Sequence, residues 1–188
     1  MGSPGHVFLL IGPSGSGKTT LIHALRRRQP QVRFLPTTTT RPPRPGERDG
    51  VEYHFSDDAD FDRALAAGDF FEWQPIHGHR YGSSKSRLEA ALSEGRVGIT
   101  SLDILGGLAV KGALGERATT IFVRPSSLAV LRERLLLRGD TDGQDLERRL
   151  QRAEMEIAQA ARCDFILINN DLEAALDQLT RIVEPYLE

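Results

Sequence analysis

Eight residues near the start of the chain have the types and spacing that bind nucleotide phosphates. They are Gly12, Pro13, Ser14, Gly15, Ser16, Gly17, Lys18 and Thr19. They fit the pattern of glycine, any four residues, then glycine, lysine and serine or threonine. Glycines let backbone N–H groups approach phosphate oxygens without a Cβ in the way, and a following helix adds partial positive charge. We expect Lys18 to reach the outer phosphates and the Thr19 hydroxyl to bind Mg²⁺.

The flanks of this loop support the same interpretation. Val7 to Ile11 is a short apolar run that predicts a buried strand before the loop. Thr20 to Arg28 predicts a helix after it, with an apolar face formed by Leu21, Ile22 and Leu25. The motif predicts nucleotide binding, but it does not say what happens to the nucleotide.

A second stretch, Thr37 to Gly50, is polar, basic and rich in proline. Its three prolines, at positions 42, 43 and 45, exclude both a helix interior and a central strand. The segment is therefore an ordered loop or a linker. Arg41, Arg44 and Arg48 lie along this stiffened backbone, which suits the binding of a second anion.

Strands and helices alternate along the rest of the chain. Strands are predicted at 32–35, 51–55, 70–73, 74–76, 97–101, 119–123 and 165–168. Helices are predicted from Asp57 to Ala67, from a Ser86/Glu89 capping box to Gly95, from Leu105 to Leu114, from Ser126 or Ser127 to Arg138, and from Asp171 to Tyr186. This alternation predicts one α/β domain with a parallel sheet covered by helices on both faces, and ligands at the carboxyl ends of its strands.

Within this single domain, residues 1–188, we expect three parts. Residues 5–36 and 85–188 form the core, and 37–84 form a small inserted α+β subdomain. Arginines 132, 134 and 138 come late in one helix and 148, 149 and 152 early in the next, around a small polar segment. Each arginine by itself suits a solvated helix face. As a set they suit a helical lid at 138–149 that brings positive charge to transferring phosphates.

Composition sets further limits on partners and location. The chain has 24 Lys and Arg against 26 Asp and Glu, a net charge of −2, so nothing drives it as a whole towards nucleic acid or an anionic membrane. The run Val7 to Ile11 is too short for a signal core or a membrane span. The single cysteine, Cys163, suits a reducing compartment, and we expect the cytoplasm. Protein partners are unknown at this stage.

Two anion sites beside a magnesium-binding loop favour a kinase for a small phosphorylated acceptor. A GTPase switch is disfavoured because the guanine-reading Asn-Lys-x-Asp pattern is absent. These residues also carry a resemblance. From about Gly5 to Tyr186 the chain resembles the guanylate kinases, which are P-loop nucleoside monophosphate kinases. The segments that carry it are Thr39 to Tyr53, Phe71-Glu72-Trp73, Gly78 to Ser83, the arginines Arg134, Arg138 and Arg149, and Asn169.

The resemblance implies a P-loop NTPase-type fold, transfer of phosphate from ATP to GMP in purine nucleotide metabolism, and a need for Mg²⁺. It places GMP on the 37–84 insertion, with dGMP left open as a second acceptor. It implies GMP contacts from Thr37, Arg41, Arg44, Tyr53, Glu72, Tyr81, Ser83 and Asp103. It implies ATP contacts from residues 12–20, which include Thr20, and an adenine-side contact from Asn169. The catalytic set it implies is Lys18, Arg41, Arg134, Arg138 and Arg149.

The chemistry of Glu72 agrees with this assignment. Guanine presents its N1–H and N2–H₂ donors side by side, and one carboxylate can accept from both. Adenine presents an acceptor at N1. Leaving such a bond unmade costs on the order of 1–3 kcal/mol, about 5- to 150-fold in selectivity.

The chain also departs from the family pattern. Where the family usually has Asp-x-Asp-x-Gln-Gly, the sequence is Ser101-Leu102-Asp103-Ile104-Leu105-Gly106. The missing first aspartate puts metal affinity and turnover in doubt. Two alternatives therefore stay open. One is a guanylate-kinase-like module that binds phosphopeptide or GMP without transfer, against which the intact phosphate-binding loop argues. The other is a P-loop kinase for a sugar phosphate.

Overall fold

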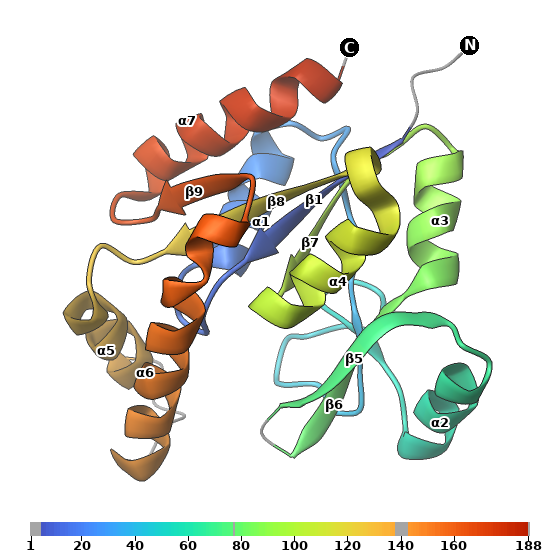
Figure 1. Cartoon of the computed structure of the whole chain (residues 1–188), viewed down its shortest axis with the longest axis horizontal. Coiled ribbons are helices and arrows are strands. Elements are labelled where there is room, and N and C mark those ends of the chain that lie inside the picture. The colour runs from blue at the N-terminus through green and yellow to red at the C-terminus, as the bar shows by residue number, and fades with distance from the viewer. Residues whose placement is uncertain (1–4, 77, 138–142, 188) are drawn as a thin grey trace.

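A five-stranded parallel sheet forms the centre of the molecule in the computed structural model, which describes residues 5–76, 78–137 and 143–187 (Figure 1). Its strand order is β2-β7-β1-β8-β9. The strands are β1 (His6–Ile11), β2 (Arg33–Phe34), β7 (Val97–Leu102), β8 (Ala118–Arg124) and β9 (Phe165–Ile168). Because the strands are parallel, the carboxyl ends of β1 and β7 meet at one edge, where Ile11 pairs with Leu102. The predicted α/β sheet is confirmed.

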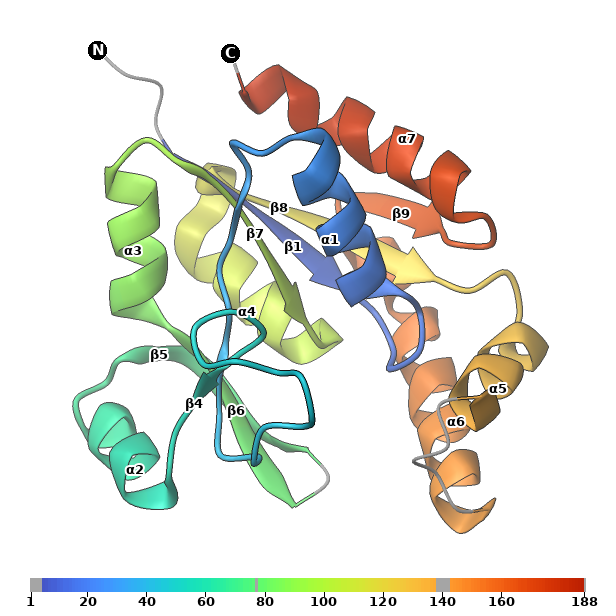
Figure 2. The same ribbon diagram turned by 180° about the vertical axis from the view of Figure 1, so that it is seen from behind.

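Helices cover both faces of this sheet, as the two opposite views show (Figures 1 and 2). One face packs against α1 (Lys18–Arg28) and α7 (Leu172–Val183), and the other against α3 (Lys85–Ser93) and α4 (Ile104–Leu114). Strand β1 is buried along its whole length because it faces both layers. Its alternate side chains divide between the two cores: Phe8 and Leu10 contact the α1 layer, whereas Val7, Leu9 and Ile11 contact the α4 layer.

A second, four-stranded sheet spans residues 38–84 and lies within the segment 37–84 that was predicted as an insertion. Its strands are β3 (Thr38–Thr39), β4 (His54–Phe55), β5 (Phe70–Ile76) and β6 (His79–Ser84), in the order β4-β3-β6-β5. Helix α2 (Asp58–Ala66) belongs to the same part, and Asp57 caps it as predicted. The predicted strands 70–73 and 74–76 are wrong as two elements, because β5 runs through both with a register shift between Phe70 and Trp73. Strand β6 was missed.

Two helices, α5 (Leu128–Leu137) and α6 (Gly143–Ala158), stand beside the carboxyl edge of the central sheet (Figure 1). They pack on each other through Leu131, Leu135, Leu146, Leu150 and Ala153. Arg138 and the rest of the 138–142 part of the predicted lid lie outside the described residues. Short 3₁₀ turns complete the chain at η1 (Gly115–Arg117), η2 (Ala160–Arg162) and η3 (Glu184–Tyr186).

One predicted helix start is wrong and another was missed. Ser84, not Ser86, caps α3, since the Ser84 hydroxyl accepts from the Arg87 N–H at 3.3 Å. The chain leaves β6 at Ser84 with extended backbone, so Ser86 already lies in the first turn. Asp103 caps α4 by accepting from the Gly106 N–H at 2.8 Å. In the described part of the chain, no helix combines the length and apolar character needed to cross a membrane.

Candidate active site

A cleft of about 620 Å³ opens at the carboxyl ends of β1 and β7. The small sheet bounds it on one side and α6 on the other, so both predicted anion sites face one cavity. Its lining includes the predicted residues Gly12, Pro13, Ser14, Gly15, Gly17, Lys18, Thr19, Thr20, Thr37, Arg41, Arg44, Tyr53, Glu72, Tyr81, Asp103, Arg134, Arg149 and Asn169. Two further predicted residues, Ser16 and Ser83, are fully buried beneath the lining.

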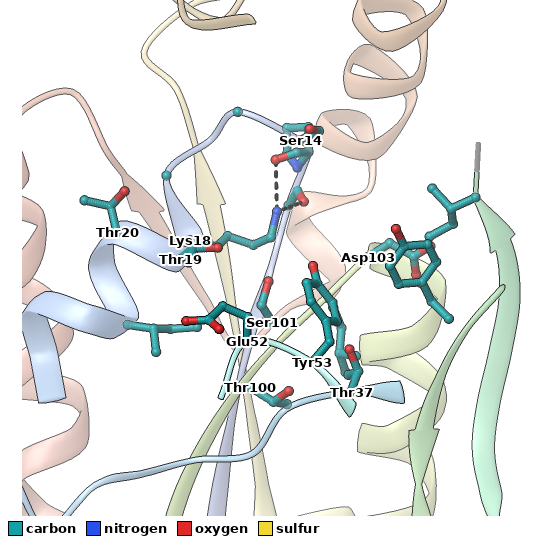
Figure 3. Close-up of a pocket in the computed structure, with 18 of the residues that line it drawn as sticks. Ser14, Lys18, Thr19, Thr20, Thr37, Glu52, Tyr53, Thr100, Ser101 and Asp103 are labelled. Carbon is teal, nitrogen blue, oxygen red and sulfur yellow. Dashed lines mark hydrogen bonds between the residues drawn. The ribbon is translucent and has the colours of Figure 1, made fainter. Parts of the chain in front are cut away.

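The phosphate-binding loop depends on glycine at two close approaches. Gly12 and Gly17 have φ angles of 144° and 94°, which side chains rarely adopt. A Cβ on Gly12 would lie 2.2 Å from the Val123 carbonyl oxygen, and one on Gly17 would lie 2.1 Å from Asn169 Nδ2. Lys18 reaches back across the loop (Figure 3), where its Nζ donates to the Gly12 carbonyl and, at 3.0 Å, to that of Pro13. The loop is therefore shaped before any phosphate contacts it.

Asn169 braces this loop from the end of β9. The side chain is only 5% exposed, and its Nδ2 donates to the Ser16 carbonyl at 2.8 Å. The Asn169 carbonyl accepts from Arg134 Nη2 at 2.9 Å. The resemblance implied an adenine contact for Asn169; the structure instead assigns its amide to the loop backbone, and adenine contact stays a prediction.

On the opposite wall, Arg41 is held by a carboxylate that sequence reasoning did not single out. Glu47 accepts two hydrogen bonds from Arg41 Nη2, at 2.9 and 2.8 Å, and one from the Arg44 N–H at 2.7 Å. Burial opposes ionisation of Glu47, but these hydrogen bonds outweigh it and lower its pKa. The Arg41 guanidinium lies 5.3 Å from the ring centre of Tyr53. The Gly-Glu pair within the proline-rich motif was the available signal for Glu47.

Glu72 is a half-buried carboxylate at the base of the cleft. Burial raises its pKa to about 7, a hydrogen bond from Ser83 Oγ at 2.8 Å lowers it, and nearby Asp103 raises it further. The Glu72 carboxyl group lies against the first turn of α4, where a Cβ on Gly106 would be 2.9 Å from its Cδ. Ser83 therefore orients Glu72 from beneath, without lining the cleft.

Asp103 lies where three elements meet. Its Oδ1 accepts from the Gly106 N–H and, at 3.2 Å, from Gln74 Nε2, and its Oδ2 accepts from Arg152 Nη2 at 3.1 Å. Arg152 also donates to Glu156 Oε1 at 3.0 Å. Sequence reasoning missed Gln74 and Glu156. Gln74 could have been found from its place two residues beyond Glu72 on the same strand face.

The cleft offers oxygen ligands of the kind that Mg²⁺ prefers. The side chains of Thr19 and Ser101 come from neighbouring elements and line the same cavity (Figure 3). Asp103 and Glu156 add carboxylates to that lining. Mg²⁺ in nucleotide sites takes few protein ligands and keeps waters and substrate phosphates. The donors present therefore fit the ion, with hydroxyl groups at both Thr19 and Ser101.

Comparison with known proteins gives one consistent family. A family model described as guanylate kinase matches residues 5–186. Guanylate kinase of Anaeromyxobacter dehalogenans is 40% identical over 181 residues, covering 96% of this chain and 80% of that protein. That of Thermotoga maritima is 38% identical, covering 95% and 86%. A solved guanylate kinase from Anaplasma phagocytophilum aligns with a TM-score of 0.77 at 26% identity, covering 97% and 86%. A shikimate kinase from Bacteroides thetaiotaomicron, with a TM-score of 0.51 at 16% identity and coverage of 95% and 98%, shares the fold alone.

Proposed function

We propose that this chain, which belongs to the guanylate kinase family, transfers the γ-phosphoryl group of ATP to GMP and so gives ADP and GDP. One observation carries this proposal together with the family. The phosphate-binding loop lines the same cleft as Arg41 and Glu72, so a donor and an acceptor nucleotide can meet in it. The enzyme is accordingly a phosphotransferase of purine nucleotide metabolism.

On the donor side, the loop from Gly12 to Thr19 binds the phosphates of ATP through its backbone N–H groups. Lys18 turns from the carbonyls of the loop to the outer phosphates. The Thr19 hydroxyl would hold Mg²⁺, which supplies charge neutralisation on the phosphates when bound. Asn169 keeps the loop in shape by its hydrogen bond to the Ser16 carbonyl.

On the acceptor side, we assign the phosphate of GMP to Arg41, Arg44, Tyr53 and Tyr81. Before GMP binds, Glu47 keeps the Arg41 side chain directed into the cleft. When GMP binds, Arg41 exchanges its hydrogen bonds to Glu47 for bonds to the phosphate. Glu72 accepts from guanine N1–H and N2–H₂. The remaining guanine and ribose contacts are assigned to Thr37, Ser83 acting through Glu72, and Asp103.

Transfer itself needs positioning and charge more than proton movement. A phosphate monoester has a second pKa near 6, so the acceptor is already ionised at neutral pH and no general base is required. Arg134 and Arg149 line the cleft from α5 and α6, and we assign them to the charge that develops on the transferred group. An arginine in this role can contribute roughly 10³- to 10⁵-fold in rate. Arg138 is assigned with them and lies outside the described residues.

The direct test is ADP release with ATP, Mg²⁺ and each of GMP, dGMP, AMP, CMP and UMP. We expect ADP release with GMP. Comparison of the rates with GMP and dGMP shows how strongly the enzyme recognises the 2′-hydroxyl of the ribose. Lys18→Ala should abolish release but leave a folded protein that still binds GMP. GMP binding without ADP release from the wild type would contradict the proposal and favour a non-catalytic binding module. Release with Lys18→Ala would contradict the assignment of the loop.

The proposed partners are therefore the two nucleotides, with dGMP as a further acceptor to be tested. We also propose a cytoplasmic location, since the substrates are cytoplasmic metabolites and the one cysteine, Cys163, is a free thiol.

A further inference from the structure

Arg152 is a cation of α6 that bridges two carboxylates lining the cleft. Its Nη2 donates to Asp103 Oδ2 at 3.1 Å, and its Nε donates to Glu156 Oε1 at 3.0 Å. The side chains of Asp103 and Glu156 are only 13% and 8% exposed. The Arg152 side chain is itself 38% exposed, but charge-assisted hydrogen bonds to carboxylates this well buried hold geometry more firmly than surface ion pairs do.

Three elements fix the Asp103 carboxylate together. The start of α4 contributes the Gly106 N–H, β5 contributes Gln74, and α6 contributes Arg152. The first two bonds both end on Oδ1, so Arg152 is the group that fixes Oδ2. Rotation of the carboxylate about its Cβ–Cγ bond is therefore limited by a side chain from the donor side of the cleft.

The charges around this bridge show why a cation is needed there. Burial, with a smaller contribution from nearby Asp103, raises the pKa of Glu156 above its usual value, although the charges of Lys18 and Arg152 act to lower it. The second oxygen of Glu156 is buried without a hydrogen-bond partner among the described residues. Without Arg152, two largely buried carboxylates would face each other with no cation bridging them, which favours displacement of one of them from its present position.

We propose that Arg152 is a positioning residue of the acceptor site, which sets the Asp103 carboxylate for GMP from the donor-side helix. This rests on the proposed function, because Asp103 is assigned there to the guanine and ribose side. Arg149, assigned to the transferring phosphate, precedes Arg152 by three residues and so shares its helix face. Helix α6, which carries the arginine assigned to the transferring phosphate, therefore also holds Asp103 through Arg152. Donor and acceptor binding are coupled through it, reciprocally.

The experiment measures affinities by titration calorimetry for GMP alone, for a non-hydrolysable ATP analogue with Mg²⁺ alone, and for GMP in the presence of that analogue. Arg152→Met should weaken GMP about tenfold, the scale of a lost charge-assisted bond, and abolish the gain in GMP affinity that the analogue gives the wild type. Affinity for the analogue should change less than about threefold, because the hydrogen bonds of Arg152 within the described part of the chain go to Asp103 and Glu156 and not to the loop. Arg152→Lys should recover part of the GMP affinity. Arg162→Met, at an exposed arginine just beyond α6, is the matched control and should behave as wild type.

A double variant separates positioning from charge balance. Arg152→Met with Glu156→Gln removes the buried charge as well as its partner, so the thermal midpoint should recover while the GMP defect persists. Recovery of GMP affinity in the double variant would overturn the proposal, since Arg152 would then only neutralise Glu156. Equal weakening of both nucleotides, or no change in GMP affinity, would also overturn it. A wild type that binds GMP poorly in every condition would instead refute the proposed function.

Discussion

The raised pKa of Glu72 makes GMP binding depend on pH in a calculable way. In the proposed complex guanine donates to the ionised carboxylate, whereas burial raises the pKa of Glu72 to about 7 in the free protein. Protons therefore compete with GMP, and the apparent dissociation constant is multiplied by 1 + 10^(pKa − pH). This factor is about 1.1 at pH 8, about 2 at pH 7 and about 11 at pH 6. A carboxyl group at its ordinary pKa of 4.5 would give a factor of only about 1.03 at pH 6.

Titration calorimetry from pH 8 to pH 6 measures this factor directly. We expect about tenfold weaker GMP binding at pH 6 than at pH 8, and release of about half a proton per GMP at pH 7, seen by comparing buffers of different ionisation enthalpy. The GMP phosphate also titrates, near pH 6, and the Glu72→Gln variant measures that share alone. Parallel loss of affinity in wild type and Glu72→Gln, with no proton released at pH 7, would refute the reasoning.

Three further changes test other parts of the structure. Gly106→Ala should leave ATP binding intact but weaken GMP at least tenfold, because the new Cβ would lie 2.9 Å from Glu72 Cδ; unchanged GMP affinity in calorimetry would contradict this placement. Burial, followed by the charge of Lys111, lowers the pKa of His6 to about 4. Stability should therefore fall from pH 6.5 towards pH 4, by up to about tenfold in the folding constant per pH unit, and His6→Gln should flatten this decline in thermal melts. Ser101→Asp should lower the Mg²⁺ concentration for half-maximal ADP release about two- to tenfold, and an unchanged titration would count against a role for that position.

The architecture could be predicted from the sequence because its signals are local. The hydrophobic pattern predicts the strand at Val7 to Ile11 and the helix after the loop, and the glycines predict the loop between them. All three form as predicted. The small sheet was less predictable. Strand β6 carries Gly82, Ser83 and Ser84 in place of the β-branched and aromatic residues typical of strands, and it forms because it pairs with both β3 and β5.

The sequence predicted which residues form the site better than it predicted how they are arranged. Motif spacing identified the phosphate-binding loop, and the family resemblance identified the acceptor-side residues of the cleft, but partners distant in the sequence set what each side chain does. Asp103 and Arg152 are 49 residues apart along the chain. In the sequence Glu47 was only one position of the proline-rich motif, and its role in holding Arg41 became clear from their hydrogen bonds in the structure. Ser83 acts beneath Glu72, because the residue is fully buried and its hydroxyl donates to the Glu72 carboxylate at 2.8 Å.

The brace between Asn169 and Ser16 has a consequence for the order of folding. These residues are 153 positions apart, so a loop made among the first residues of the chain is completed by one of the last. During synthesis from the N-terminus, a growing chain that lacks β9 carries the full phosphate-binding motif without this brace. We therefore expect the loop to reach its final shape only after β9 has joined the sheet, so that nucleotide affinity is gained late in folding.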